Sequence, residues 1–129
     1  MQRSAPVRIM IVDDEPLIRL YVRDILEGAG FEAEEAGSAE EALQRIREVG
    51  AFSTVITDID MPGEMDGLGL AHSVRAEHPD MAILIMSGRR LPRPEQIPEA
   101  ALLMTKPFSE DRLLNVLRMF DRPGSPANG

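Results

Sequence analysis

Short apolar segments that end abruptly in polar residues dominate this chain. Residues 7–12 form a nearly continuous apolar run of strand length, and three acids follow it directly. Such a run is typical of a strand that is covered on both faces in a parallel sheet. From Pro16 to Gly28 the apolar residues recur instead at helical spacing, and proline is well tolerated in the first turn of a helix. The chain therefore begins with a strand followed by a helix.

The alternation of strand-like and helix-like segments continues along the chain. Further strands are expected over residues 31–36, 52–57, 82–86 and 101–105. Further helices are expected over residues 38–49, 68–78 and 109–120. Ser38 with Glu41 predicts a capping box for the first of these helices, and Ser109 predicts a cap for the last one. The strand at 31–36 is rich in glutamate, so we place it at an edge of the sheet.

The connection between the fourth and fifth strands contains three prolines. Pro92, Pro94 and Pro98 each remove a backbone donor from any helix interior, so we expect a shortened or irregular helix there. Five strand–helix units with short connections and right-handed crossovers imply an α/β fold. The predicted architecture is a doubly wound, five-stranded parallel sheet with helices on both faces.

The length of 129 residues corresponds to one domain. We assign residues 7–120 to this domain, residues 1–6 to a flexible N-terminal extension and residues 121–129 to a flexible C-terminal tail. On this assignment the chain has no room for a DNA-binding output domain. The absence of cysteine excludes disulfides, thiolate metal sites and a cysteine nucleophile.

The net charge narrows the choice of partners. A formal charge of −8 argues against nucleic acid and anionic membranes, and favours cations or basic protein patches. No apolar run approaches the ~18 residues of a membrane span. The first residues also lack the apolar core of a secretory signal. We therefore expect a cytoplasmic protein that is a monomer or a weak dimer.

Reactive side chains follow the ends of several predicted strands. In strand order they are Asp13, Asp14, Asp58, Ser87 and Lys106. In an open doubly wound sheet, ligands bind outside the carboxyl ends of the strands, so these side chains should converge. Carboxylates ~4 Å apart repel one another by about 4 kcal/mol per pair at an effective dielectric constant near 20. A cation or a shared proton must compensate, and carboxylate oxygens without thiolate or histidine favour Mg²⁺, or Mn²⁺, over zinc.

This set of groups is suited to phosphoryl transfer. Asp58 can attack phosphorus as a carboxylate nucleophile, while the metal and Lys106 neutralise the equatorial oxygens. The hydroxyl of Ser87 can donate a hydrogen bond to the same oxygens.

In these residues the chain resembles the receiver domain of two-component response regulators, in particular the single-domain type to which the chemotaxis response regulator belongs. The resemblance covers about Arg8 to Phe120. The motifs that carry it are Val12-Asp13-Asp14-Glu15-Pro16, Asp58-Ile59-Asp60-Met61-Pro62 with Asp66-Gly67, Ser87-Gly88 and Lys106-Pro107-Phe108. It implies a flavodoxin-like strand order, 2-1-3-4-5.

The resemblance also implies roles for individual residues. Asp58 would accept a phosphoryl group from a histidine kinase or a histidine phosphotransfer protein, and Ser87 and Lys106 would sense it. The implied Mg²⁺ ligands are Asp13, Asp14, Asp58 and the backbone carbonyl of Asp60. Such a protein is a switch that catalyses at most its own phosphorylation and dephosphorylation. Its output would pass to an unidentified downstream protein or to a further phosphotransfer step.

Other interpretations remain open. A haloacid-dehalogenase-type phosphatase uses similar groups, although its paired acids come last in the chain, and a degenerate receiver would only bind partners. Asp13 and Asp14 taken alone could cap a helix, and Ser87-Gly88 could be a plain turn. The Lys106-Pro107 bond can be cis because proline lowers the cost of that isomer. Leu103 stands where many receivers carry an aromatic switch residue.

Overall fold

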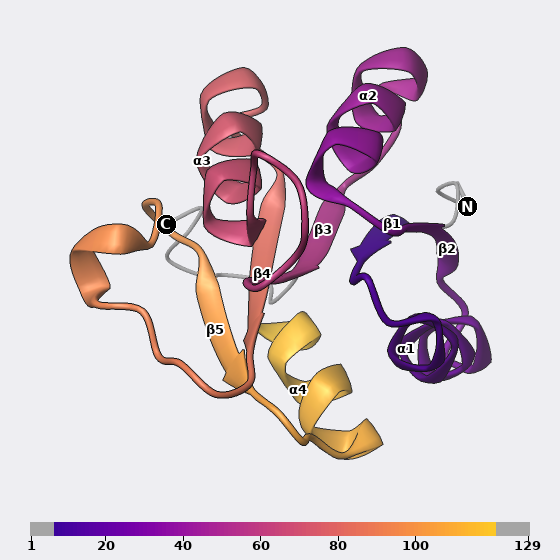
Figure 1. Cartoon of the computed structure of the whole chain (residues 1–129). Helices are drawn as coiled ribbons and strands as arrows, with labels where there is room; N and C mark the ends of the chain where they lie inside the picture. Colours follow the sequence, from indigo (N-terminus) through magenta and orange to yellow (C-terminus); the bar gives the residue numbers. More distant parts are fainter. Residues whose placement is uncertain (1–6, 121–129) are drawn as a thin grey trace.

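The five expected strands pair into one parallel sheet in the order β2-β1-β3-β4-β5 (Figure 1). The computed structural model describes residues 7–120, so the expected extension at 1–6 and tail at 121–129 lie outside the described residues. The strands are β1 (Arg8–Val12), β2 (Glu32–Ala36), β3 (Thr54–Asp58), β4 (Ala82–Ser87) and β5 (Leu102–Thr105). The helices are α1 (Pro16–Gly28), α2 (Ala39–Val49), α3 (Gly67–Glu77) and α4 (Glu110–Phe120). The predicted doubly wound fold is thereby confirmed.

Two hydrophobic layers enclose the sheet. Helices α2 and α3 cover one face, and α1 and α4 cover the other (Figure 1). Within β1, Met10 packs into the first layer and Ile11 into the second, because successive strand side chains point to opposite faces. Both residues are fully buried. This two-sided burial is the physical reason why the strand is apolar almost without interruption.

Ion pairs connect the edge strand β2 to the neighbouring elements. As expected, it lies at the edge of the sheet, next to β1. Its glutamates pair with arginines of β1, α1 and α2: Glu32 with Arg8, Glu34 with Arg45, and Glu35 with Arg19 and Arg23. Charged side chains on an edge strand discourage further strand pairing, so this composition suits the position.

The helix caps follow the sequence with one difference. The Ser38 hydroxyl accepts a hydrogen bond from the Glu41 N–H at 3.1 Å, as a capping residue should. The Glu41 carboxylate accepts from the Gly37 N–H at 2.9 Å, and not from the Ser38 N–H that a capping box requires. The predicted box is therefore wrong in its second half. Ser109 caps α4 through the Arg112 N–H at 3.1 Å, as expected.

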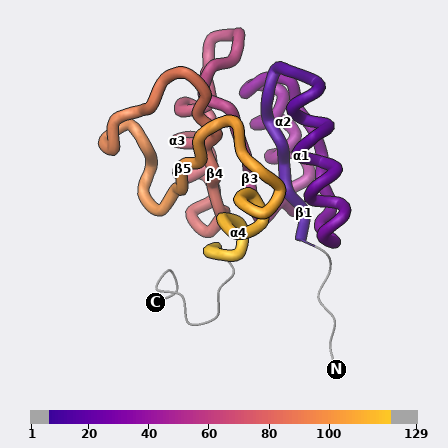
Figure 2. The backbone as a smooth tube through the Cα atoms, turned by 90° about the horizontal axis from the view of Figure 1, so that it is seen from below, coloured from indigo at the N-terminus to yellow at the C-terminus, as the bar shows by residue number. Residues whose placement is uncertain are grey.

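The crossover between β4 and β5 has no α-helix. It contains one short 3₁₀ helix, η1 (Pro94–Gln96), and in Figures 1 and 2 this orange segment lies on the outer side of β5. Two side chains of α3 contact its backbone. Nε2 of His72 lies 2.8 Å from the Gln96 carbonyl oxygen, and Nε of Arg75 donates to the Glu99 carbonyl oxygen at 3.0 Å. The prolines thus prevent a regular helix, and α3 supplies two of the hydrogen-bond contacts of the crossover backbone.

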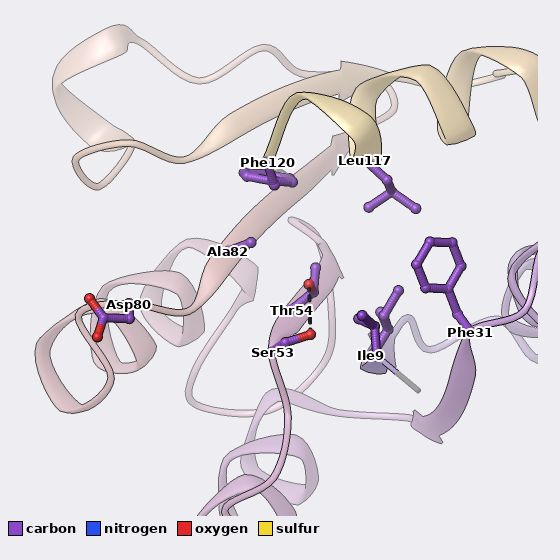
Figure 3. Close-up of a pocket in the computed structure, with 9 residues that line it drawn as sticks. Ile9, Phe31, Ser53, Thr54, Asp80, Ala82, Leu117 and Phe120 are labelled. Atoms are coloured by element: carbon purple, nitrogen blue, oxygen red, sulfur yellow. Dashed lines mark hydrogen bonds between the residues drawn. The ribbon is translucent and has the colours of Figure 1, made fainter. Parts of the chain in front are cut away.

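A pocket of about 200 Å³ lies at the amino ends of the strands (Figure 3). Ile9, Thr54 and Ala82 line it from the sheet, and Leu117 and Phe120 close it from α4. It therefore lies at the opposite end of the strands from the reactive side chains.

Over residues 7–120, none of the helices has the length and apolar character needed to cross a membrane.

The turn into α3 brings two stretches of backbone into contact. The Gly67 N–H donates to the Ile59 carbonyl oxygen at 2.8 Å, and a Cβ atom on Gly67 would lie 1.7 Å from the Asp58 carbonyl oxygen. Two backbone segments cannot absorb such an overlap by rotating a side chain. Glycine at this position is therefore a condition for placing Asp58 against α3.

We expect the substitution Gly67→Ala to destabilise the fold by about 3 kcal/mol or more, because the backbone around Asp58 must shift. Urea unfolding would measure the loss. Gly28→Ala is the matched control, since a Cβ atom there meets nothing within 4 Å and alanine is the better helix former. Equal stability of the two variants would contradict the close approach at Gly67.

Candidate functional site

Three carboxylates from two neighbouring strands meet at the carboxyl edge of the sheet. Asp13 and Asp14 follow β1, and Asp58 is the last residue of β3. One oxygen from each lies within 4.8 Å of the others. Asp13 is fully buried, Asp58 is 7% exposed and Asp14 is exposed. The predicted convergence of these three side chains is therefore observed, with Asp14 at the solvent side of the cluster.

Lys106 brings a positive charge into this cluster. It directly follows β5, and its Nζ lies 3.0 Å from Oδ2 of Asp13 and 3.1 Å from Oδ1 of Asp58. Its backbone N–H donates to the Ser87 carbonyl oxygen at 2.7 Å, which ties it to the end of β4. The Lys106-Pro107 peptide bond is cis. The two ion pairs show that the ammonium group reaches from the end of β5 to Asp13 and Asp58.

The charges in the site are not balanced. Burial raises the pKa of Asp58 above its ordinary value, and the neighbouring Asp13 raises it further, although Lys106 acts against both. Burial lowers the pKa of Lys106, but its hydrogen bonds to Asp13 and Asp58 outweigh this effect and raise it. One ammonium group therefore faces three carboxylates. A further cation at this position would relieve the remaining repulsion.

The geometry fits a small divalent cation. Two oxygens bound to one Mg²⁺ at about 2.1 Å cannot lie more than about 4.2 Å apart, so oxygens within 4.8 Å need only a small adjustment. All three side chains offer carboxylate oxygens, which Mg²⁺ prefers. The Asp60 carboxylate does not belong to this cluster and instead accepts a hydrogen bond from Nη2 of Arg90 at 3.0 Å. For Asp60, only its backbone carbonyl remains a candidate ligand.

Ser87 occupies the end of β4, the strand next to β3. Its neighbour Met86 pairs with Asp58 in the sheet register, and Ser87 itself is fully buried. The Ser87 hydroxyl donates a hydrogen bond to the backbone carbonyl oxygen of Arg90. In this state the hydroxyl proton is therefore used within the crossover.

Two supporting residues were not predicted from the sequence. Nη1 of Arg19 donates to the Asp13 carbonyl oxygen at 2.7 Å, and Nε of the same residue contacts Glu35 at 2.9 Å. The Glu40 carboxylate accepts from the N–H groups of Glu64 and Met65, which lie in the loop after Asp58. Backbone donors, first the N–H of Glu40 itself and then that of Met65, hold the pKa of Glu40 below its ordinary value. The spacing of Arg19 and Arg23 on one helix face, opposite a glutamate-rich strand, was an available signal for their pairing with Glu35.

Comparison with known proteins agrees with this geometry. Residues 9–118 match the family model of the response regulator receiver domain. The response regulator receiver protein CpdR of Brucella abortus is 32% identical over 84% of this chain and 91% of its own length. The C4-dicarboxylate transport transcriptional regulatory protein DctD of Rhizobium meliloti is 36% identical over 89% of this chain, which spans only 25% of that longer relative. The chain likewise spans 12% and 24% of the next two curated relatives.

Solved structures show the same architecture. A response regulator receiver protein from Sinorhizobium medicae superposes with a TM-score of 0.84 at 27% identity, over 89% of this chain and 94% of that one. The response regulator TrrA of Thermotoga maritima, solved in complex with Mg²⁺ and BeF, gives a TM-score of 0.74 at 31% identity, over 88% of this chain and 98% of that one. These likenesses agree with the observed fold and strand order.

The raised pKa of Asp58 predicts a pH-dependent effect of Asp58→Asn. A carboxyl whose pKa is higher in the folded state favours folding when protonated, so the wild-type protein loses this contribution as pH rises above the unfolded value near 4. Asparagine does not titrate. Without added metal, the variant should therefore melt at a higher temperature than wild type at pH 7, and this gain should shrink toward pH 3.

Calorimetry at both pH values would measure the difference in melting temperature. Asp80→Asn is the control, because Asp80 is exposed and lies at the opposite end of the sheet. A gain for Asp58→Asn that is the same at pH 3 and pH 7 would show that the ionisation of Asp58 is not its cause.

Proposed function

The chain belongs to the response regulator receiver family, and on this premise we propose that it accepts a phosphoryl group on Asp58 from a histidine kinase or a histidine phosphotransfer protein. The transfer depends on Mg²⁺, and the phosphorylated protein signals through a partner protein or through onward phosphotransfer. One observation carries the proposal: the buried Asp58 carboxylate lies 3.1 Å from the ammonium group of Lys106 and within 4.8 Å of two further carboxylates.

The residues of the site divide the chemistry among them. An oxygen of Asp58 forms a bond to phosphorus while the P–N bond to the donor's imidazole breaks. Lys106 neutralises negative charge on the phosphoryl oxygens and is already held in place by Asp13. Most of the catalysis in such a transfer comes from placement and charge neutralisation.

The metal would be held by the side chains of Asp13, Asp14 and Asp58 with the backbone carbonyl of Asp60. When bound, Mg²⁺ supplies positive charge to the phosphoryl oxygens. Arg19 fixes the Asp13 backbone by a hydrogen bond to its carbonyl oxygen. Glu40 fixes the loop that follows Asp58 by accepting hydrogen bonds from two of its N–H groups. These contacts support the site without taking part in the transfer.

An apolar surface next to the site supports a protein as phosphodonor. Helix α1 begins two residues after Asp14, and its side chains Leu17 and Leu20 are 78% and 50% exposed. Tyr21 on the same helix is also exposed and donates a hydrogen bond to the Phe108 carbonyl oxygen at 3.0 Å. Exposed apolar side chains at the rim of a reactive site favour docking of another protein.

The proposed role is that of a switch, which turns over no substrate other than its own phosphoryl group. The phosphatase alternative is not retained, since the matching family model and the solved structures are those of receivers. A cytoplasmic location belongs to the same proposal. A degenerate receiver that only binds partners would differ from the proposed phosphoacceptor in one measurable respect, because its Asp58 would take no phosphoryl group.

We expect Mg²⁺ to stabilise the folded protein, because it relieves repulsion that exists only when the three carboxylates are together. At a free concentration of about 100 times the dissociation constant, the gain is about 2.7 kcal/mol. Thermal melting with and without millimolar Mg²⁺ would measure it. Asp14→Ala should lose most of this gain, whereas Asp24→Ala on the exposed face of α1 should keep it. A gain of equal size in Asp14→Ala would argue against the site.

We expect acetyl phosphate with Mg²⁺ to add one phosphoryl group to the wild-type protein, since the site supplies the nucleophile and the charge neutralisation itself. Intact mass spectrometry would detect the adduct, which should be absent in Asp58→Asn and unchanged in Asp80→Asn. Undiminished labelling of Asp58→Asn would move the acceptor to another residue. A wild-type protein that takes no label would favour the degenerate receiver.

A further inference from the structure

Arg90 connects two parts of the site that lie far apart in the sequence. Its backbone carbonyl oxygen accepts the hydrogen bond from the Ser87 hydroxyl. Its guanidinium group contacts Oδ1 of Asp60 through Nη2 at 3.0 Å. Asp60 lies two residues after Asp58, so one residue of the crossover touches both the end of β4 and the loop that follows the proposed phosphoacceptor.

The neighbouring Arg93 provides a comparison within the same segment. Its guanidinium group pairs with Glu95 at 2.8 Å, so this contact stays inside the crossover. Both ion pairs are exposed to solvent, and both arginines precede the short helix η1 or adjoin it. The two residues therefore differ mainly in the part of the molecule that they contact.

The hydroxyl of Ser87 can serve only one acceptor at a time. A serine side chain carries a single donor proton, and here this proton is directed to the Arg90 carbonyl oxygen. Donation to a phosphoryl oxygen on Asp58 therefore requires that the bond to Arg90 breaks. Any contact that fixes the Arg90 backbone opposes this change.

We propose that Arg90 is a positioning residue for Ser87: its ion pair with Asp60 holds the Arg90 carbonyl where it captures the Ser87 hydroxyl in the unphosphorylated protein. The inference rests on the proposed function and adds to it a residue that sets how readily the site accepts a phosphoryl group. Asp60 acts here through its side chain, separately from its backbone carbonyl.

Removal of the Arg90 side chain should change the affinity for a phosphoryl mimic in a direction that distinguishes positioning of Ser87 from direct attraction of the anion. A contact present only in the free state lowers the affinity for a ligand that requires the other state. Removing it should therefore tighten the binding of a phosphoryl mimic. If the guanidinium group instead attracted the anion directly, its removal would weaken binding. An exposed ion pair is weak, so the expected change is about two- to fivefold.

The experiment measures the dissociation constant of beryllofluoride, a phosphoryl mimic, by calorimetry on the full chain at saturating Mg²⁺. Arg90→Ala should bind it about two- to fivefold more tightly than wild type. Arg90→Lys, which keeps the positive charge, should remain near wild type, and Arg93→Ala should match wild type. All these side chains are exposed, and thermal melting would confirm that each variant is folded.

A second comparison tests whether Arg90 acts through Ser87. In a Ser87→Ala background the hydroxyl is absent, so adding Arg90→Ala should change the affinity by less than about 1.5-fold. Tightening that persists in this background would overturn the positioning role. Weaker or unchanged binding by Arg90→Ala alone would overturn it as well.

The outcome for wild type separates this inference from the proposed function. If wild type binds beryllofluoride and takes the label from acetyl phosphate, while Arg90→Ala binds no more tightly, only the role of Arg90 fails. If wild type does neither, the phosphoacceptor function itself fails.

Discussion

The repulsion among the three clustered carboxylates is the constraint on which the rest of the site depends. Asp13 is buried completely, so its charge must be met by protein groups, and Lys106 meets it at 3.0 Å. That ammonium group also lies 3.1 Å from Asp58, where burial and Asp13 together favour the protonated carboxyl. The site is thereby held in an incompletely neutralised state, in which a bound cation would improve the balance of charge.

Backbone contacts around the cluster hold the repelling carboxylates in place. Neighbouring parallel strands fix the positions of Asp13 and Asp58, and the contact between Gly67 and the Asp58 carbonyl fixes the start of α3. Arg19 and Glu40 then restrain the two loops from outside the cluster. These restraints act on backbone atoms, whereas Lys106 is the group that contacts the side chains of Asp13 and Asp58.

Much of this arrangement could be predicted from the sequence, because strand-length apolar runs and the polar residues after them determine which side chains share a sheet edge. The convergence of Asp13, Asp58 and Lys106 follows from topology alone. Strand limits were less accurate: β3 was expected to end at residue 57, but its pairing with β4 continues through Asp58, after the apolar pattern has stopped. The contacts of Arg90 and Glu40 were not predictable, since they depend on the paths of irregular loops.

The attachment of the β4–β5 crossover to α3 has a consequence for the evolution of this surface. His72 and Arg75 contact backbone carbonyl oxygens of Gln96 and Glu99, and not their side chains. Every amino acid offers the same carbonyl group, so substitutions at residues 96 and 99 leave these two contacts with α3 in place. Duplicated copies of such a protein could diverge in the partners they recognise while retaining an unaltered chemical centre.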